Sequence, residues 1–467
     1  MAENQSQENY IRKNFLLILV LLSGAFITIL NQTLLGTALP PIMEDLNLTE
    51  STVQWLQSVF MLVNGIMIPI TAFLIEKYTT RRLFLTAMGL FTIGTFIAAI
   101  APGFSFLMVG RIFQAAGAGI MMPLLQTIMF LIFPIERRGT AMGMFGLVIA
   151  FAPAIGPSLS GWLVDHFPWR SVFYVVLPIA ILNIIAAYFL LKNVTKQKNP
   201  TVDVLSIILS TLGFGGLLYG FSIAGSAGWI SAQFIISIIV GAVSLLIFIL
   251  RQLKLEHPIL EFRVFKYTTF SLSTGLGMIV FMSMIGTAVI LPLYMQNMLG
   301  FSAFDSGLVL LPGAIIMGIM NPITGRLFDK FGAKGLSITG FTLLVITTFL
   351  FTNLSTETTF TYLSVMNAFR MLAIAMVMMP VTTAGLNELP PHLIPHGSAM
   401  NNTFRQVSGA VGTALLVTIM TTSAIPINSV EGAIHGVNVS FIVAGVIAVV
   451  GFILSFFIKN TIPRESM

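Results

Sequence analysis

The sequence contains no cysteine and very little charge. Without cysteine, the chain can form no disulfide bond and can carry out no thiol chemistry. Charged residues make up only 9% of the 467 residues, whereas hydrophobic residues make up 56%. A soluble core needs far less apolar sequence, so this composition predicts an integral membrane protein. The net charge of +6 does not indicate nucleic-acid binding, because the basic residues lie almost entirely between long apolar runs.

The motifs that would give the chain an enzymatic activity are also missing. There is no GxxxxGK[ST] phosphate loop, which argues against an ATP-driven machine. No Ser/His/Asp or Cys/His set occurs at a common membrane depth, so we expect no catalytic site. His392 and His396 are four residues apart, a spacing that could hold a metal on a helix. Pro395 and an expected loop setting argue against this, so we predict neither a metal nor a cofactor.

Long apolar runs recur along the whole chain. Crossing a bilayer takes about 20 residues, and fourteen runs reach that length. With the N-terminus inside, 19 of the 23 lysines and arginines fall in cytoplasmic segments, and only Arg170 lies outside. We therefore predict a multi-pass membrane protein with both termini cytoplasmic. The predicted spans are 15–36, 51–75, 83–101, 105–132, 139–163, 171–191, 203–223, 230–251, 268–297, 305–325, 336–353, 358–386, 398–421 and 438–459.

The chain also repeats itself weakly. Four short echoes occur in the same order in the two parts of the sequence, which favours two parallel six-helix halves. Helices seven and eight have no counterpart and read as an insertion. We predict an N-terminal half over 1–192, an inserted pair with its basic loop over 193–267, and a C-terminal half over 268–467. The echoes pair Gly36–Met43 with Gly286–Met295, Ala72–Arg82 with Gly325–Gly335, Met121–Pro123 with Met378–Pro380, and Gly139–Met142 with Gly397–Met400.

Three arginines lie within predicted spans. Arg111 stands about a turn and a half inside, where a charge costs at least a few kcal/mol, and Gln114 shares its helix face. Either the pair lines a transport pathway, or Arg111 merely extends to the outer headgroups. Arg370 lies near the middle of its predicted span, and Arg405 lies about two turns into its own. For these two, a structural bond to backbone carbonyls and a role in transport both remain open.

The fifth span combines small residues with proline. Ala152, Gly156 and Ser160 recur every four residues, beside a ridge that contains Pro157 and Gly161. Small residues at this spacing let helix backbones approach closely, and proline bends a helix and frees backbone carbonyls. A bent, closely packed helix next to a buried cation indicates a transporter.

The motifs together carry a family resemblance. They are NQTLLGTALPPIM in the first span, RxxQxxGAG from Arg111, GPSLSG from Gly156, WRSVF from Trp169, LPLYMQNMLGFSAFDSGLVLLPG from Leu291 and HGSAMNNTFRQVSGAVGTA from His396. The chain resembles the major facilitator superfamily, and within it the fourteen-helix drug:proton antiporters of bacteria linked to lincomycin and multidrug resistance. The resemblance implies export of small lipophilic drugs in exchange for protons by alternating access. We predict a monomer in the bacterial plasma membrane.

The resemblance also implies roles for particular residues. In the family, the arginine that matches Arg111 is assigned to proton coupling. Two inner loops of mixed charge act in the family as a latch that holds the cytoplasmic side closed. Here the first copy departs from the family pattern, with Glu76 for aspartate and Thr79-Thr80 in place of a glycine and a basic residue. The matching loop residues are Glu76, Arg81 and Arg82 in the first copy, and Gly325, Asp329, Lys330 and Lys334 in the second.

Acidic residues are missing from the depth of every predicted span. Many fourteen-helix relatives carry an aspartate where this chain has Asn31. A proton carrier needs a titratable group, and arginine is effectively always charged. The coupling carboxylate is therefore unassigned; Asp165 beside His166, or Glu388, could serve from a helix end. We expect a preference for neutral or weakly basic substrates over permanently dicationic ones.

Two alternatives to drug export remain. One is a facilitator or flippase for a lipid or amphiphilic metabolite, which the missing carboxylate favours. The other is a membrane enzyme or receptor with no transport cycle. An enzyme would need clustered histidine, aspartate or glutamate at one membrane depth, and the sequence shows no such cluster.

Overall fold

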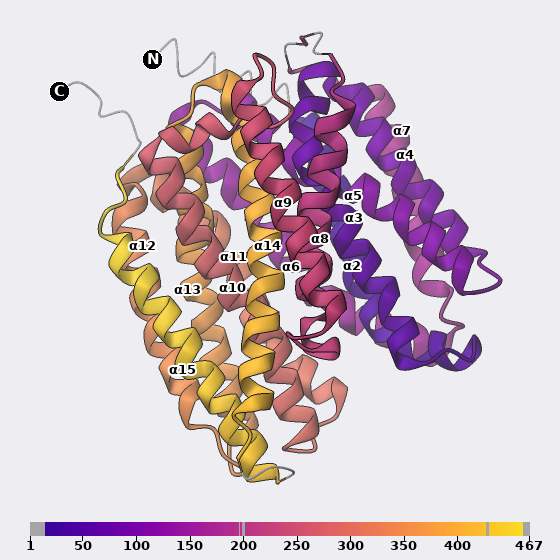
Figure 1. The fold of residues 1–467 in the computed structure, drawn as a ribbon, viewed down its shortest axis with the longest axis vertical. Helices are drawn as coiled ribbons and strands as arrows, with labels where there is room; N and C mark the ends of the chain where they lie inside the picture. The colour runs from indigo at the N-terminus through magenta and orange to yellow at the C-terminus, as the bar shows by residue number, and fades with distance from the viewer. Residues whose placement is uncertain (1–14, 196, 199–200, 426–428, 461–467) are drawn as a thin grey trace.

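The computed structural model describes residues 15–195, 197–198, 201–425 and 429–460. Over these ranges the chain forms fourteen long α-helices, four short 3-10 helices and no strand (Figure 1). The first six long helices are α2 (Phe15–Asp45), α3 (Glu50–Lys77), α4 (Thr80–Ala99), α5 (Phe104–Ile132), α6 (Arg138–His166) and α7 (Ser171–Leu190). Two more, α8 (Val204–Ala227) and α9 (Ala232–Lys254), follow. The last six are α10 (Thr268–Asn297), α11 (Ala303–Phe331), α12 (Ala333–Leu350), α13 (Phe360–Asn387), α14 (Ile394–Thr422) and α15 (Val430–Ser455).

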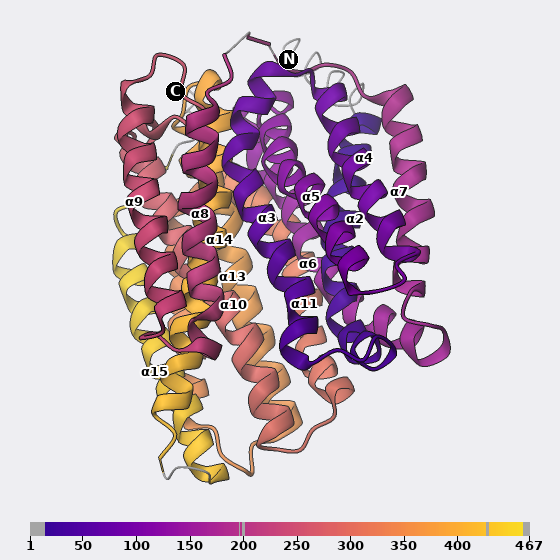
Figure 2. The same ribbon diagram turned by 45° about the vertical axis from the view of Figure 1, so that its right-hand side comes forward.

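The helices are arranged as two groups with a pair against one face. Helices α2–α7 lie on one side of the molecule and α10–α15 on the other, and the described chain begins and finishes at the same end (Figure 1, Figure 2). Helix α8 packs against α3 of the first group and α14 of the second, with α9 outside it (Figure 2). This arrangement agrees with the all-α fold of two six-helix halves plus an inserted pair.

Helix α14 shows why apolarity alone undercounts the spans. Thirteen described helices are long and apolar enough to cross a membrane, and α14 is not among them. Its polar side chains face the protein interior, where Asn401, Thr403 and Arg405 are buried. A polar helix is tolerated in a bilayer when such groups are buried in protein. The predicted count of fourteen therefore holds, although α14 begins four residues earlier than predicted.

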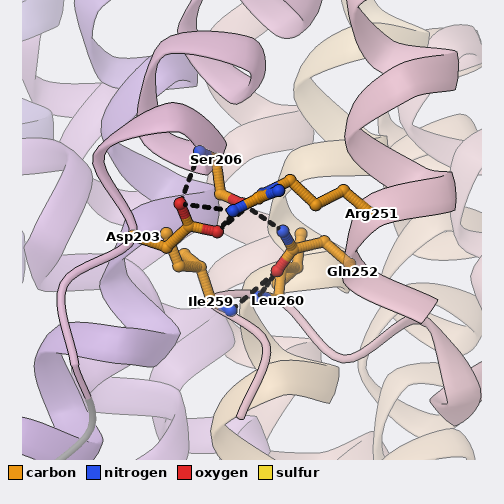
Figure 3. Close-up of polar contacts among 6 residues, drawn as sticks. All are labelled: Asp203, Ser206, Arg251, Gln252, Ile259 and Leu260. Atoms are coloured by element: carbon orange, nitrogen blue, oxygen red, sulfur yellow. Dashed lines mark hydrogen bonds and ion pairs between the residues drawn. The ribbon is translucent and has the colours of Figure 1, made fainter. Parts of the chain in front are cut away.

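An ion pair joins the two inserted helices at one end. Asp203 caps α8, and its carboxylate accepts two hydrogen bonds from the Arg251 guanidinium, at 2.8 Å from Nε and 3.1 Å from Nη2 (Figure 3). The Ser206 hydroxyl donates to the same carboxylate at 2.6 Å. Arg251 is the main reason that the pKa of Asp203 falls to about 2. The pair is bidentate, the geometry in which arginine binds carboxylate best.

The neighbouring Gln252 connects this ion pair to the segment that follows the inserted helices. Its Nε2 donates to the Ser206 hydroxyl at 2.6 Å, and its Oε1 accepts the backbone N–H groups of Ile259 and Leu260 at 2.7 and 3.3 Å (Figure 3). Gln252 is fully buried, so these bonds satisfy groups that water cannot reach. The segment before α10 is thereby fixed to the ends of α8 and α9.

Candidate functional site

Arg111 lies fully buried inside the first half and connects three helices. Its Nη1 lies 3.1 Å from Asn31 Oδ1 of α2 and 2.8 Å from Gln114 Oε1 of its own helix α5. Its Nε donates to the Leu56 carbonyl of α3 at 3.1 Å, and the guanidinium stands 4.3 Å from the Phe60 ring centroid. These contacts direct the side chain inward rather than toward headgroups. The sequence placed Asn31 and Arg111 on one pathway, and the structure brings them into contact.

Arg370 occupies the corresponding place in the second half, on α13. It is also fully buried. Its Nη2 donates to the Ser283 carbonyl of α10 at 3.1 Å and to the Ser283 hydroxyl, and its Nη1 donates to the Thr348 hydroxyl of α12. Each half therefore holds one arginine between three helices. In the first half, the acceptors for the arginine include side-chain amide oxygens. In the second half, they are hydroxyls and a backbone carbonyl.

Arg405 on α14 is the third buried arginine. Its Nη2 donates to the Thr382 hydroxyl of α13, and 4% of the residue is exposed. Across the part of the chain that the structure describes, no acid lies within ion-pair distance of Arg111, Arg370 or Arg405. All three cations are held by neutral acceptors, an arrangement that is expensive in a membrane and rare without a function.

The small residues of α6 seat it against α2. A Cβ added at Gly156 would lie 2.1 Å from Thr33 Oγ1, and the Ser160 hydroxyl donates to the Leu34 carbonyl at 2.6 Å. Ala152 is buried on the same face. Pro157 and Gly161 face elsewhere: Pro157 is exposed, and a Cβ at Gly161 would meet open space. The four-residue spacing therefore makes a close helix contact, in which Pro157 and Gly161 take no part.

One contact between the halves is centred on Asp329, at the end of the molecule where the described chain begins and finishes (Figure 1, Figure 2). Asp329 lies near the end of α11, and its carboxylate accepts the N–H groups of Gly139 and Thr140 at 2.7 and 2.8 Å. The Thr140 hydroxyl donates to it as well, at 2.5 Å. The carboxylate thus caps the N-terminus of α6, where negative charge is favourable. We call Asp329 with Gly139 and Thr140 the Asp329 latch.

Close backbone packing surrounds the Asp329 latch. A Cβ on Gly325 would lie 2.2 Å from the Gly139 carbonyl, and one on Gly143 would lie 2.6 Å from the Asn321 carbonyl. The Asn321 side chain donates to the Gly146 carbonyl at 2.8 Å. Helices α6 and α11 can cross this closely only because small residues line the crossing.

The second contact between the halves is centred on Glu76, at the end of α3. Lys198 Nζ pairs with the Glu76 carboxylate at 2.7 Å, and the Lys198 N–H donates to the Glu76 carbonyl at 2.8 Å. His396 of α14 places Nε2 3.6 Å from the same carboxylate, while its Nδ1 accepts the Glu261 N–H at 3.2 Å. We call Glu76 with Lys198, His396 and Glu261 the Glu76 latch.

The structure corrects one expectation here and adds partners that sequence reasoning missed. His396 was expected in a loop, and this is wrong: Pro395 lies in the first turn of α14, a favourable place for proline, so the helix includes His396. The partners of Glu76 were not predicted. The echo of Gly139 at Gly397 could have revealed His396, because it aligns that residue with Arg138 in the first turn of α6.

The predicted basic latch residues do not contact either latch carboxylate. Arg81 stacks on Tyr188 with 4.5 Å to the ring centroid, and Lys330 stands 5.2 Å from that of Phe331. Arg82 is exposed, and the Lys334 N–H donates to the Asn460 side chain at 3.1 Å. Their shared location at one end of the bundle matches the charge asymmetry of membrane loops.

A third contact crosses between the halves further inside the bundle. Asn402 of α14 donates to Gln126 Oε1 of α5 at 2.6 Å, and both side chains are buried. Six residues separate Gln126 from the end of α5 and eight separate Asn402 from the start of α14, about 9 and 12 Å at the usual helical rise. This polar bond and the two latches close the same end of the molecule.

The two acids considered as proton carriers, Asp165 and Glu388, lie at helix ends. Asp165 lines an open pocket of about 740 Å³ between the far ends of α2 and α6, together with Glu44. Glu388 is exposed at the end of α13. Among the described residues, no three His, Asp or Glu side chains gather as a metal site would require. His392 is exposed, whereas His396 is buried.

Comparisons with known proteins place this geometry in context. The family model of the Major Facilitator Superfamily matches residues 21–413. The chain is 58% identical to the uncharacterized MFS-type transporter YcnB of Bacillus subtilis (strain 168), over 94% of each chain. It is 43% identical to the lincomycin resistance protein LmrB of the same organism, over 95% of each. The solved human organic anion transporter MFSD10 (TETRAN) shares the fold, with a TM-score of 0.70, 13% identity and coverage of 95% of this chain and 99% of that one.

Proposed function

This chain belongs to the Major Facilitator Superfamily, and on that premise we propose that it exports small lipophilic drugs in exchange for protons by alternating access. It is a multi-pass membrane transporter rather than an enzyme. The observation that carries the proposal is its likeness, over nearly the whole chain, to proteins named for lincomycin resistance. The resemblance read from the motifs is thus confirmed at the level of the family.

The contacts between the halves support alternating access. Both latches and the Gln126–Asn402 bond close one end of the bundle, and each joins a helix of α2–α7 to a helix of α10–α15. All are polar contacts, which water can replace when the halves separate. Opening this end therefore requires these polar contacts to break, together with the close packing of α6 against α11.

The buried arginines support a pathway through the two halves. We propose that Asn31, Arg111 and Gln114 in the first half, with Arg370 and Arg405 in the second, border the route of substrate and protons. Because these arginines are bonded to neutral groups, they can exchange hydrogen-bond partners during the cycle. We also propose that the protein acts as a monomer in the bacterial plasma membrane, with both termini cytoplasmic.

Transport in proteoliposomes under an imposed pH gradient tests the function. We expect accumulation of lipophilic compounds driven by the gradient, strongest for neutral and weakly basic drugs. Liposomes without a gradient, and protein with Gly156→Leu, are the controls. Transport that ignores the gradient would instead support a facilitator or flippase of amphiphiles, the alternative that the lack of a deep carboxylate favours.

Orientation has its own test, because the natural chain has no cysteine. Single cysteines at Asn47 and Ser429 should react with an impermeant thiol reagent added outside intact cells. Cysteines at Lys266 and Lys334 should stay unlabelled. The inverted pattern would reject the proposed orientation.

A further inference from the structure

His396 is a buried histidine at the point where four segments of the chain meet. It lies on α14, 4% exposed, with Nε2 directed at Glu76 of α3. Lys198, in the segment that leads into the inserted helices, holds Glu76 at 2.7 Å. Glu261, in the segment that leads out of them, donates its N–H to Nδ1 of His396 at 3.2 Å. Both ends of the insertion thus meet at a single contact between the halves.

The hydrogen bond from Glu261 defines the protonation state of His396. A backbone N–H can only donate, so Nδ1 must accept and carries no proton. The ring is therefore the neutral tautomer, with its proton on Nε2 facing Glu76. A second proton, on Nδ1, would point directly at the Glu261 N–H. The closed conformation has no place for it.

The carboxylate of Glu76 is not enough to reverse this preference. Its distance of 3.6 Å from Nε2 exceeds hydrogen-bond length, and Lys198 already pairs with it at shorter range. His396 also lies in the first turn of α14, where the positive end of the helix dipole disfavours a cation. Three other ionisable groups belong to these segments. The Glu261 carboxylate pairs with Arg263 at 3.2 Å, and His392 is exposed one turn before His396.

We propose that His396 is a proton-binding site of the transport cycle. It is neutral while this end is closed, takes a proton at Nδ1 when the halves separate, and returns that proton to water before they close again. The proton comes from the solution that this end faces, which is the cytosol in the orientation proposed above. The inference rests on the alternating-access cycle of the proposed function.

The sign of the pH effect follows from linkage. Opening exposes His396, and an exposed histidine gains charge between about pH 8 and pH 5. Because only the open state binds this proton, acid shifts the equilibrium toward opening. The shift is up to about tenfold for each pH unit below the point at which the exposed ring titrates. Acid on this side therefore slows closing and the return of the carrier.

Distances between spin labels across the closed end test this directly. Lys192→Cys and His392→Cys place one label on each half at exposed positions of this cysteine-free chain. Double electron–electron resonance is then measured in nanodiscs, without any drug, from about pH 8 to about pH 5.5, the range in which histidine titrates. The population with the short distance should fall severalfold as the pH drops. His396→Gln should abolish that fall, because glutamine can accept the Glu261 N–H without titrating.

Two further variants keep the test decisive. His257 is an exposed histidine in the segment that also contains Glu261, and His257→Gln should retain the full pH response. Glu76→Gln retains the Glu261 bond and should retain the sign of the response, which gives a readout even if His396→Gln fails to fold. A pH-independent distance, a response that survives His396→Gln, or closing in acid would each overturn the proposal. Since no drug is present, these results stand apart from success or failure of the drug-transport assay.

Discussion

The two latches occupy equivalent positions in the two halves but are built differently. In each, a carboxylate at the end of one helix faces the start of a helix in the other half. Asp329 accepts two backbone N–H groups and a hydroxyl directly. Glu76 instead meets a histidine side chain and a lysine from the linker. One latch is thus fixed to the backbone, whereas the other depends on side chains that can titrate or move.

The two latches therefore differ in how firmly they hold the halves together and in whether pH can affect them. The Asp329 latch needs close contact between α6 and α11, and its carboxylate is held by backbone N–H groups and a hydroxyl, with the Arg137 guanidinium near enough to act on it electrostatically. The Glu76 latch includes both linkers of the insertion, so it can report the state of that insertion and the pH. We infer that the first holds the halves together and the second regulates when they part.

Paired glycine substitutions give the largest expected contrast between the latches. A Cβ at Gly139 would lie 2.4 Å from the Gly325 carbonyl, a backbone atom that cannot yield. At the equivalent Gly397 the nearest atom, at 2.3 Å, is the tip of the Leu389 side chain, which can rotate. Overpacking of the first kind costs about 1–3 kcal/mol. We expect Gly139→Ala to reduce efflux about tenfold or more, and Gly397→Ala to change it less than about twofold.

Efflux rates in proteoliposomes, with protein amounts matched by size-exclusion chromatography, measure this contrast. Gly335→Ala is the neutral control, since a Cβ there meets open space. Equal losses of efflux for Gly139→Ala and Gly397→Ala would mean that the two latches contribute equally to the contact between the halves.

Removing each carboxylate should produce the next largest effect. Asp329→Ala removes three hydrogen bonds to an anion, each worth about 1.5–3 kcal/mol at most, and leaves the α6 N-terminus uncapped. Glu76→Ala removes a partly exposed pair with Lys198, where surface pairs contribute about 0–1 kcal/mol. The label distances described for His396 measure closure at neutral pH. The short-distance population should fall much further for Asp329→Ala, and the reverse order would contradict the assignment of strength to that latch.

The same contrast shows what sequence can and cannot predict. The apolar runs and the charge of the loops predicted the fourteen helices, including α14, which a stricter hydropathy criterion leaves out because of its polar residues. Local spacing predicted the packed face of Ala152, Gly156 and Ser160. Contacts between distant residues were out of reach, because nothing in the chain states that Arg111 touches Asn31 or that Glu76 meets His396. The sequence grouped Arg81 and Lys330 with their latches by motif alone, and neither contacts a latch carboxylate.

Asn31→Asp extends the comparison to the two buried arginines. The structure places Asn31 Oδ1 3.1 Å from Arg111, so an aspartate there would pair with Arg111 rather than face the substrate alone. Arg370 would keep its neutral partners. Substituting one residue of a buried hydrogen-bond network changes the interaction energies among its members by about 0.5–3 kcal/mol. We expect a severalfold change in efflux and a displaced pH profile, while broader recognition of monovalent cations requires that the position also lines the cavity.

A panel of one neutral, one monocationic and one dicationic compound measures this, with wild type beside Asn31→Asp. The wild-type protein should export the dication least, because none of the acids lies deep in the described spans. Strong dication export by the wild type would contradict that ranking, and would mean that a carboxylate at a helix end reaches the substrate.

The smallest expected effect comes from Asp203, which belongs to neither latch and tests whether pH acts through His396 alone. Arg251 lowers the pKa of Asp203 to about 2, so the pair stabilises the insertion at every pH above the unfolded value near 4 and loses that contribution only as the pH falls toward 2. Between pH 5 and 8 it is fully ionised and cannot contribute to any pH response. The pair is partly exposed, with 37% of the Arg251 side chain and 18% of that of Asp203 accessible. Asp203→Asn should therefore lower stability by only about 0.2–1 kcal/mol, equally at pH 5 and pH 8. Thermal unfolding in detergent measures the loss, and the label distances should keep the wild-type pH response. If Asp203→Asn altered that response, the insertion itself would have to transmit the pH effect to the Glu76 latch, and His396 would no longer be its sole origin.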